Sequence, residues 1–392
     1  MGDSGYGGGR LACRWAGWRD RLCGRHRQAN ARAGYLSPPS GGGGLVWVNA
    51  GAARDSVAVA ADLAGAVFER IRDLRLALTF EQAHPEALNR LDGLTRIGVG
   101  FGPADTAAAI RRTLQRLSPL GVIEVATELR PRLSRALSEL GLHHAVIGCS
   151  PCGEPVPSPE WVHVARAGQY QSWLCADAPG ELLGPSDPLT LLTEAQLEPS
   201  LRALTGCDAE APLLWLHGPP VEQLKRYLSN WRAIRMGSRP GLLAISADHT
   251  SSRHALEAVL RAVEPDFCST GSWNRQPLAP GSVLLLDSRR WVPAEAVACH
   301  AALLVDAKPA VRWQAMAAGA AIVGEPIREP GGPTSVMSDA DYPDLLFGEV
   351  AIVLSSPAQQ RRLGDSARRE FWRERRHAGE AMGRLLDRVF QW

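Results

Sequence analysis

Lysine is scarce in this 392-residue sequence. Lys225 and Lys308 are the only two, so nearly all of the basic charge comes from arginine. The 43 basic and 41 acidic side chains leave a net charge of +2, which does not indicate a nucleic-acid-binding protein. Apolar runs of 18 residues are also absent, and the first thirty residues lack the apolar core of a signal peptide. We therefore expect a soluble globular protein with two or three domains and no transmembrane helix.

Cysteine pairs are equally few. The eight cysteines are scattered, and only Cys149 and Cys152 form a C-x-x-C pair. No second cysteine pair or histidine pair completes a zinc set, so we expect reduced thiols in the cytosol. His143 and His144 also lack further ligands at a recognisable spacing and are expected to be ordinary core or surface histidines.

Residues 1–44 differ from the rest in composition. They hold seven arginines and two aspartates, and Trp15, Trp18 and Leu22 fall near helical spacing among them. One interpretation is a short interfacial helix that contacts anionic lipid. The other is a basic tail, and the Pro-Pro-Ser-Gly-Gly-Gly-Gly run at 38–44 favours flexibility. The sequence leaves both interpretations open.

Strands and helices alternate from Leu45 onward. The helices are expected at 56–72, 83–91, 106–117 and 133–140, and the strands at Leu45–Ala50, Leu74–Phe80, Arg96–Phe101, Gly121–Ala126 and His144–Gly148. This alternation predicts a parallel, doubly wound α/β sheet. The pattern weakens after Ser150, where the only strand expected before Pro212 is Ser172–Ala176.

A second series follows residues 237–240, which we interpret as a linker between two lobes. Before it, a strand at Pro212–Gly218 and a helix at 221–232 are assigned to the first lobe. After it, strands are expected at Gly241–Ala247, Val283–Asp287, Ala302–Asp306, Ala320–Gly324 and Val350–Leu354, with a loop at 327–347 and a helical tail from Pro357. The predicted domains are a basic flexible segment at 1–44, a Rossmann-like domain at 45–236 and a second one at 237–392. Two such lobes finished by long C-terminal helices are typical of GT-B glycosyltransferases.

Glu128 stands just after a predicted strand, at the start of a helix. Open α/β sheets bind ligands at this position, and backbone N–H groups stabilise a carboxylate there. In the alternative interpretation Thr127 caps the helix and Glu128 complements the helix dipole. The spacing alone favours the alternative.

Three segments in order resemble the N-terminal domain of the 3-deoxy-D-manno-octulosonic acid (Kdo) transferases. They are LVWVNAGAARDS at 45–56, GPAD at 102–105 and ATELRPRL at 126–133. The family shows W-x-H-A-x-S-x-G-E, P-x-D and E-T-E-L-W-P-N at these places, and its tail resembles PAQQRRLGDSARR at 357–369. The resemblance covers most of 45–150, is loose after 282 and hardly extends between 150 and 240.

The resemblance implies a GT-B enzyme that transfers Kdo from CMP-Kdo to a lipid A precursor, with no cofactor and no metal in the chemistry. It implies a peripheral protein at the cytoplasmic face of the inner membrane. The family's catalytic carboxylate falls on Asp55, and its second carboxylate on Glu128. Asn49, Arg54 and Arg130 fall on the acceptor side, with Asn49 in place of a histidine and Arg130 in place of a tryptophan.

Asp55 departs from the family, which has glutamate here. Aspartate keeps the carboxylate but shortens its reach by one methylene, and a base must lie within hydrogen-bond distance of the proton that it removes. Asp55 is also placed to be the N-cap of a helix that starts at Ser56. The general-base and capping roles are both compatible with the sequence.

The donor side departs further, since the family's Gly-Gly and P-R-H motifs are missing. Asp287 and Ser288 stand for a D-T pair, Gln314 falls where a ribose-binding glutamate would be, and His249 lies near a family S-T-H turn. A CMP donor needs cations for its phosphate, and the candidates near strand ends are Arg289, Arg290, Lys308 and Arg312. Lys308 is the strongest of these, because it follows an apolar strand and precedes a helix.

These departures leave two alternatives to a Kdo transferase. One is a diverged GT-B transferase that uses another nucleotide sugar. The other is a non-catalytic paralogue that binds lipid or another enzyme as a scaffold. The sequence does not decide the acceptor, the number of sugars transferred or the oligomeric state.

Overall fold

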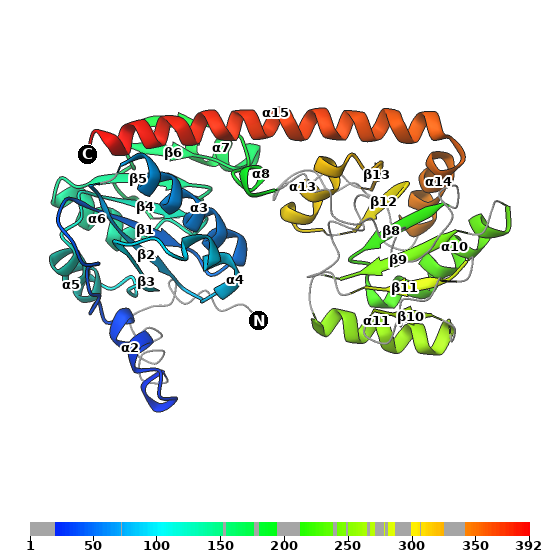
Figure 1. Ribbon diagram of the computed structural model, residues 1–392, viewed down its shortest axis with the longest axis horizontal. Coiled ribbons are helices and arrows are strands. Elements are labelled where there is room, and N and C mark those ends of the chain that lie inside the picture. Colours follow the sequence, from blue (N-terminus) through cyan, green and yellow to red (C-terminus); the bar gives the residue numbers. More distant parts are fainter. Residues whose placement is uncertain are drawn as a thin grey trace. The chain divides into compact units, whose positions relative to one another are not determined.

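The described residues of the computed structural model are 20–71, 73–151, 154–175, 180–193, 212–237, 241–247, 250–264, 267–270, 278, 281–286, 299–305, 307–324 and 342–392. The chain divides into two compact units (Figure 1). The first comprises Met1–Leu192 and Arg375–Trp392, and the second comprises Thr193–Glu374.

A seven-stranded parallel sheet forms the centre of the first unit. Its strand order is β3-β2-β1-β4-β5-β6-β7. The strands are β1 (Leu45–Ala50), β2 (Arg75–Phe80), β3 (Ile97–Phe101), β4 (Gly121–Val125), β5 (His143–Ile147), β6 (Trp161–His163) and β7 (Glu181–Leu183). The order reverses between β1 and β4, which is where doubly wound sheets bind ligands.

Helices cover both faces of this sheet. They are α2 (His26–Arg32), α3 (Arg54–Arg70), α4 (Pro85–Leu88), the 3-10 turn η1 (Asn89–Leu91), α5 (Ala107–Leu117), α6 (Pro131–Glu139), α7 (Ala167–Cys175) and α8 (Leu189–Leu192). Because side chains alternate along β1, Val46 and Val48 pack with α3 on one face, whereas Trp47 packs with α5 and α6 on the other.

The second unit holds a six-stranded parallel sheet in the order β10-β11-β9-β8-β12-β13. Its strands are β8 (Leu213–His217), β9 (Leu242–Ser246), β10 (Cys268–Ser269), β11 (Val283–Leu285), β12 (Ala301–Leu304) and β13 (Ile322–Val323). Its helical elements are the 3-10 turn η2 (Val221–Gln223), α10 (Leu224–Gly237), α11 (Thr250–Val263), α13 (Pro309–Ala318) and α14 (Tyr342–Ser355). Tyr227, Trp231 and Phe347 are large members of its core.

Helix α15 (Pro357–Phe390) begins in the second unit and belongs to the first unit from Arg375 onward. Near its start, Gly364 has no room for a side chain, because a Cβ there would lie 2.2 Å from the carbonyl oxygen of Gly319. Near its end, Leu385 and Val389 join the apolar core of the first unit, and Trp392 stacks on His143 with ring centres 5.3 Å apart.

The predicted fold class, two Rossmann-like lobes with parallel sheets and a long C-terminal helix, is confirmed. The predicted boundary between the lobes at 236/237 is wrong. Strand β8 was assigned to the first lobe, but it pairs with β9 and β12 in the second sheet. The supposed linker at 237–240 therefore connects two elements of one unit, and its residues 238–240 lie outside the described part of the chain.

Two other predicted strands are helices. The segment at 172–175 is the end of α7, and Val350–Leu354 lies within α14. Val350 and Val353 are both buried beside Phe347, a helical spacing that a short apolar run does not reveal. Residues 342–347 of the expected loop also belong to α14, and strands β6 and β7 were not expected.

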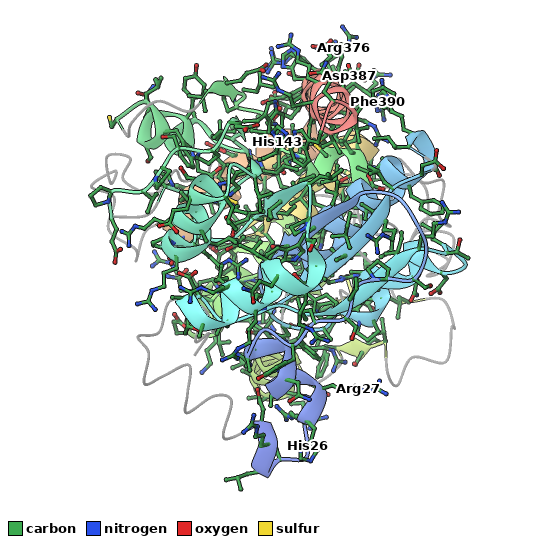
Figure 2. The ribbon with its side chains drawn as sticks, turned by 90° about the vertical axis from the view of Figure 1, so that its left-hand side faces the viewer. His26, Arg27, His143, Arg376, Asp387 and Phe390 are labelled. Carbon is green, nitrogen blue, oxygen red and sulfur yellow. The ribbon has the colours of Figure 1, made fainter. Side chains whose placement is uncertain are left out.

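The segment expected to be flexible is packed where it is described. Arg112 Nη1 donates to the carbonyl of Ala33 at 2.6 Å, and Arg116 Nε donates to that of Leu36 at 2.7 Å. Residues 26–44 therefore dock on the first unit, and Figure 2 shows His26 and Arg27 at the projecting tip of α2. Trp15 and Trp18 lie outside the described residues. None of the described helices is both long enough and apolar enough to cross a membrane.

Candidate functional site

Two turns meet at the carboxyl edge of the first sheet, where the strand order reverses. One follows β1 and the other follows β4. Gly51 N–H donates to Val125 O at 3.1 Å, and Ser56 Oγ donates to Ala126 O at 3.1 Å. A Cβ on Gly51 would lie 2.5 Å from Ala126 O, so only glycine allows this approach. The turn that carries Asp55 is thereby fastened to the turn that carries Glu128.

Ala126 shows that the second turn is under strain. Its φ is +45°, in the left-handed region that costs a residue with a Cβ roughly 1–2 kcal/mol. Ala126 N–H donates to Ile147 O at 2.7 Å, so the conformation is held from β5 as well as by Ser56. Backbone strain of this kind is often found at functional turns.

Asp55 lies in the first turn of α3 and is half-buried. The helix starts at Arg54 and its N-cap is Ala53, so the capping role considered for Asp55 is wrong. The helix begins two residues earlier than the spacing predicted. A carboxylate in the first turn is still stabilised by the helix dipole.

Glu128 is exposed and lies between β4 and α6. It forms a parallel bridge with Ser150, and Leu129 N–H donates to Ser150 O at 3.3 Å. The N-cap of α6 is Arg130, so Thr127 does not cap this helix as considered, and its hydroxyl bonds the Glu128 carbonyl at 2.8 Å.

Asp105 instead provides acceptors for the start of α6. Its two carboxylate oxygens accept from Arg132 N–H at 3.3 Å and Leu133 N–H at 3.2 Å. Burial raises the pKa of Asp105, an effect that the positive charge of Arg130 partly offsets. The segments at 102–105 and 126–133, which resemble the Kdo transferases, are thus joined in space.

Asn49 is fully buried on β1, one residue before the strand ends. Trp47 Nε1 donates to Thr79 Oγ1 at 2.8 Å, and Thr79 Oγ1 donates to Asn49 Oδ1 at 2.8 Å. The Asn49 amide nitrogen has no hydrogen-bond partner among the described residues. Arg54 is more than half exposed and pairs with Glu86 at 3.4 Å.

Arg130 is inside the unit, at 2% exposure. Its Nε lies 3.0 Å from Glu124 Oε1, its Nη1 donates to Pro103 O at 3.2 Å, and its guanidinium lies over the Trp47 ring at 5.7 Å. The other Glu124 oxygen lies 3.0 Å from His144 Nε2. Arg130 therefore affects the carboxyl edge of the sheet indirectly, by fixing the position of the Glu128 turn.

Electrostatics within this buried cluster favour an ionised Glu124. Burial alone would raise the pKa of Glu124, but the hydrogen bond from His144 and the charge of Arg130 bring that pKa below its ordinary value. Cys149 is buried nearby, and burial together with Glu124 raises the pKa of its thiol to about 12. Cys149 is therefore a poor nucleophile, and Cys152 lies outside the described residues.

The second unit repeats the Trp47 arrangement at its own carboxyl edge. Trp215 Nε1 donates to Ser246 Oγ at 2.8 Å, and His217 Nδ1 lies 2.8 Å from the same hydroxyl. His217 pairs in register with Ser246, as Asn49 pairs with Thr79. Strand β1 in the first sheet and strand β8 in the second thus each carry a tryptophan and a polar residue that share one hydroxyl.

Helix α13 starts beside this edge. Lys308 is its exposed N-cap residue, and the Lys308 side chain makes no capping hydrogen bond. Arg312 follows one turn later and is half-buried. Burial lowers the pKa of Arg312, and Glu370 of α15 opposes that effect. Gln314 is half-buried on the same helix, whereas Asp287, Ser288, Arg289, Arg290 and His249 lie outside the described residues.

That Glu124, Arg130 and His144 form one buried cluster was not predicted from the sequence. Its signal is Glu124, an acidic residue in an otherwise apolar strand, since such a residue needs a buried partner. His144 bonds Glu124 in this cluster, and among the described residues no group of three or more His, Cys, Asp or Glu side chains could hold a metal ion. Ser56, which fastens the two turns, gave no sequence signal.

Comparison with known proteins identifies the fold. No family model matches the chain, and no curated protein matches it. Among solved structures, the UDP-GlcNAc 2-epimerase from Neisseria meningitidis bound to UDP-GlcNAc is similar at 10% identity, with a TM-score of 0.55 over 89% of this chain and 100% of that one. Another UDP-N-acetylglucosamine 2-epimerase is similar at 12% identity and a TM-score of 0.57, over 90% and 98%.

A UDP-glucosyltransferase from Polygonum tinctorium is similar at 11% identity and a TM-score of 0.53, over 90% of this chain and 99% of that one. At these identities the similarity shows the fold alone. The predicted GT-B architecture is therefore confirmed along nearly the whole chain.

Proposed function

We propose that this chain is a glycosyltransferase that moves Kdo from CMP-Kdo to a lipid A precursor at the inner membrane. The observation that carries the proposal is the fastening of the Asp55 turn to the Glu128 turn by Gly51 and Ser56. Both turns leave the sheet at the reversal of strand order, where α/β folds bind ligands. The choice of Kdo rests on the three segments that resemble the Kdo transferases.

Asp55 is the general base in this proposal. Its carboxylate takes the proton of the acceptor hydroxyl as the hydroxyl oxygen attacks the anomeric carbon of the donor sugar. The bond from that carbon to the phosphate oxygen breaks, and CMP leaves with the electron pair. Glu128 orients either the acceptor or Asp55. The fixed backbone of both turns supports this role, because a base must be held within hydrogen-bond distance of its proton.

Asn49, Arg54 and Arg130 have different parts on the acceptor side. Arg54 is the accessible one, at 59% side-chain exposure. Asn49 and Arg130 are buried, and they stabilise the carboxyl edge of the first sheet from inside the unit. Arg130 holds the Glu128 turn through Glu124 and Pro103.

The donor phosphate binds at the start of α13 in this proposal. The positive end of the helix dipole and the positive charge of Lys308 favour an anion there. Arg312 adds charge one turn later and Gln314 contacts the ribose. Asp287, Ser288, Arg289, Arg290 and His249 complete the donor contacts. The mechanism needs neither a metal nor a cofactor.

The second candidate is a GT-B transferase with a UDP-sugar donor. The observation that favours it is that solved structures of this fold contain uridine nucleotides, as in the Neisseria enzyme bound to UDP-GlcNAc. Gln314 is compatible with either nucleotide, because it contacts only ribose in the proposed arrangement. The third candidate is a scaffold that binds neither donor.

Transfer of labelled Kdo from CMP-Kdo to a lipid A precursor tests the proposal directly. We expect turnover by the purified chain, a loss of at least about 100-fold in Asp55→Ala, and little change in Asp73→Ala. Asp73 is an exposed carboxylate just before β2, at the opposite edge of the same sheet.

Thermal stabilisation by CMP and by UDP separates the candidates. Stabilisation by UDP alone, with no Kdo transfer, favours the second candidate. Full Kdo transfer by Asp55→Ala would contradict the role of Asp55. Absence of thermal stabilisation by either nucleotide would favour the third candidate, a scaffold that binds neither donor.

A further inference from the structure

Helix α15 carries an unusual concentration of positive charge. It holds nine arginines and five acidic side chains, whereas the whole chain has a net charge of only +2. The remainder of the protein is therefore net negative, although residues 1–44 and α10 also hold more basic than acidic side chains. Such a local excess attracts polyanionic surfaces more effectively than the net charge suggests.

The arginines of the first half of α15 are mostly exposed. The exposed residues between 361 and 376 include Arg361, Arg362, Arg368, Arg369, Arg373 and Arg376. The ion pairs of Arg368 with Asp365 and of Arg373 with Glu370 are long and exposed, at 4.0 and 3.9 Å, and Arg368 Nη2 also donates to Ala318 O at 2.9 Å. For the others the described residues include no acidic group within ion-pair distance. Exposed pairs at such distances neutralise little charge.

Trp372 lies in the middle of these arginines and is 47% exposed. At 3.6 residues per turn, Arg361, Arg369, Trp372 and Arg376 form one stripe along the helix. The indole contacts the fully buried Phe371 ring edge-on, with centres 5.3 Å apart. Figure 2 shows Arg376 on the outer side of α15.

We propose that this face of α15, the Trp372 stripe, docks on an anionic lipid bilayer. Indole rings favour the boundary between headgroups and acyl chains. Guanidinium groups beside an indole bind lipid phosphates, so a helix with this composition lies in the plane of the interface. The proposal does not depend on the sugar-transfer chemistry, because it concerns a helix face outside both sheet edges.

The tip of α2 is the rival surface. Arg21, Arg25 and Arg27 are exposed there, with Leu22 at 67% exposure. The neighbouring acid, Asp20, is buried against Arg32 at 2.9 Å and does not offset this charge. Residues 20–27 at the tip include no tryptophan, tyrosine or phenylalanine. Its three arginines provide a control with the same change in net charge.

Flotation of the full chain with vesicles tests the proposal. Vesicles of phosphatidylcholine with phosphatidylglycerol should carry the protein, and phosphatidylcholine alone should not. The triple variant Arg361→Glu, Arg369→Glu, Arg376→Glu should reduce binding on the order of 100-fold. The matched variant Arg21→Glu, Arg25→Glu, Arg27→Glu should retain most of it. Trp372→Ala should weaken binding by a smaller factor, and added salt should weaken it in every case.

Thermal midpoints of all variants show whether they fold. Folded α15 variants that bind as well as the parent would overturn the proposal, as would loss of binding in the α2 variant alone. Equal binding to uncharged vesicles, or binding to RNA without binding to vesicles, would also overturn it. Failure of nucleotide binding has no bearing on these outcomes.

Discussion

In each unit one strand, β1 or β8, carries a tryptophan and, two residues later, a polar side chain, and both groups bond one hydroxyl on a neighbouring strand. The two units differ in the residues that lie beside this hydrogen-bonded arrangement. In the first unit these residues are the buried Glu124–Arg130–His144 cluster, and in the second they form a polar helix start with an exposed lysine. The same scaffold thus supports a rigid, internally charged edge and an open, cationic one.

This difference distinguishes charged residues that stabilise the carboxyl edge of a sheet from charged residues that contact a ligand. In the first unit charge is buried, so it orders the Glu128 turn and its neighbours. In the second unit the charge of Lys308 lies at the surface. Variants of the buried charges should therefore affect stability, and variants of the exposed charge should affect binding.

Arg130→Met should have the largest effect. It leaves Glu124 buried without its cation, which costs about 3–5 kcal/mol of unfolding free energy. Adding Glu124→Gln should recover most of that loss, because glutamine still offers an acceptor to His144. Urea unfolding measures both. Arg135→Met, whose arginine pairs with Glu154 at the surface, should cost less than about 1 kcal/mol.

If Arg130→Met proves as mild as Arg135→Met, the contrast between a rigid and an open edge fails. If the double variant is as unstable as Arg130→Met, the loss comes from packing against Trp47 and not from the isolated charge.

Lowering the pH should destabilise the first unit through His163. Burial lowers the pKa of His163 to about 4, so the unfolded chain binds a proton at a higher pH than the folded chain does. Stability should therefore fall as the pH drops from about 6.5 to about 4, by on the order of 3 kcal/mol. His163→Gln keeps a donor for Ser186 and should flatten this part of the profile.

The measurement is the urea midpoint of parent and variant across that pH range. His143→Gln is the control, because His143 is only half-buried and pairs with Glu160 at the surface. A parent profile that keeps its full slope in His163→Gln would assign the effect to other groups.

Trp47→Phe and Trp215→Phe should cost similar amounts, about 1–2 kcal/mol each. Each change removes one buried indole N–H from a hydroxyl at 2.8 Å. Thermal or urea unfolding compares them. A much larger cost at Trp47 would mean that the guanidinium of Arg130 over its ring contributes more than the shared hydrogen bond.

Lys308→Ala should have the smallest effect on stability and a clear one on binding. We expect about tenfold weaker binding of the donor nucleotide and an unchanged thermal midpoint. Lys225→Ala is the matched control, since it removes the only other lysine, exposed on α10. Calorimetric titration measures both. Equal affinities in the two variants would remove Lys308 from the donor site.

The first five strands could be predicted from sequence because each is an apolar run bounded by turn residues. The lobe boundary could not, since β8 continues the same rhythm and nothing local marks a change of sheet. Arg130 was assigned to the acceptor side from the resemblance alone. Its buried partners, Glu124 and Pro103, are brought to it by the tertiary structure and could not be predicted from the sequence. His144 reaches Glu124 only because Val122 and His144 pair in register.

Helix α15 also bears on the order in which the protein forms during synthesis. The first unit takes Leu385 and Val389 from the last part of the chain into its core. Domains generally fold as they leave the ribosome, the N-terminal one first. Here the part of the first unit's core that packs against Leu385 and Val389 stays exposed while the whole second unit is synthesised. A chain interrupted after Glu374 would leave that part of the core exposed, which makes the last turns of α15 the closing step of folding.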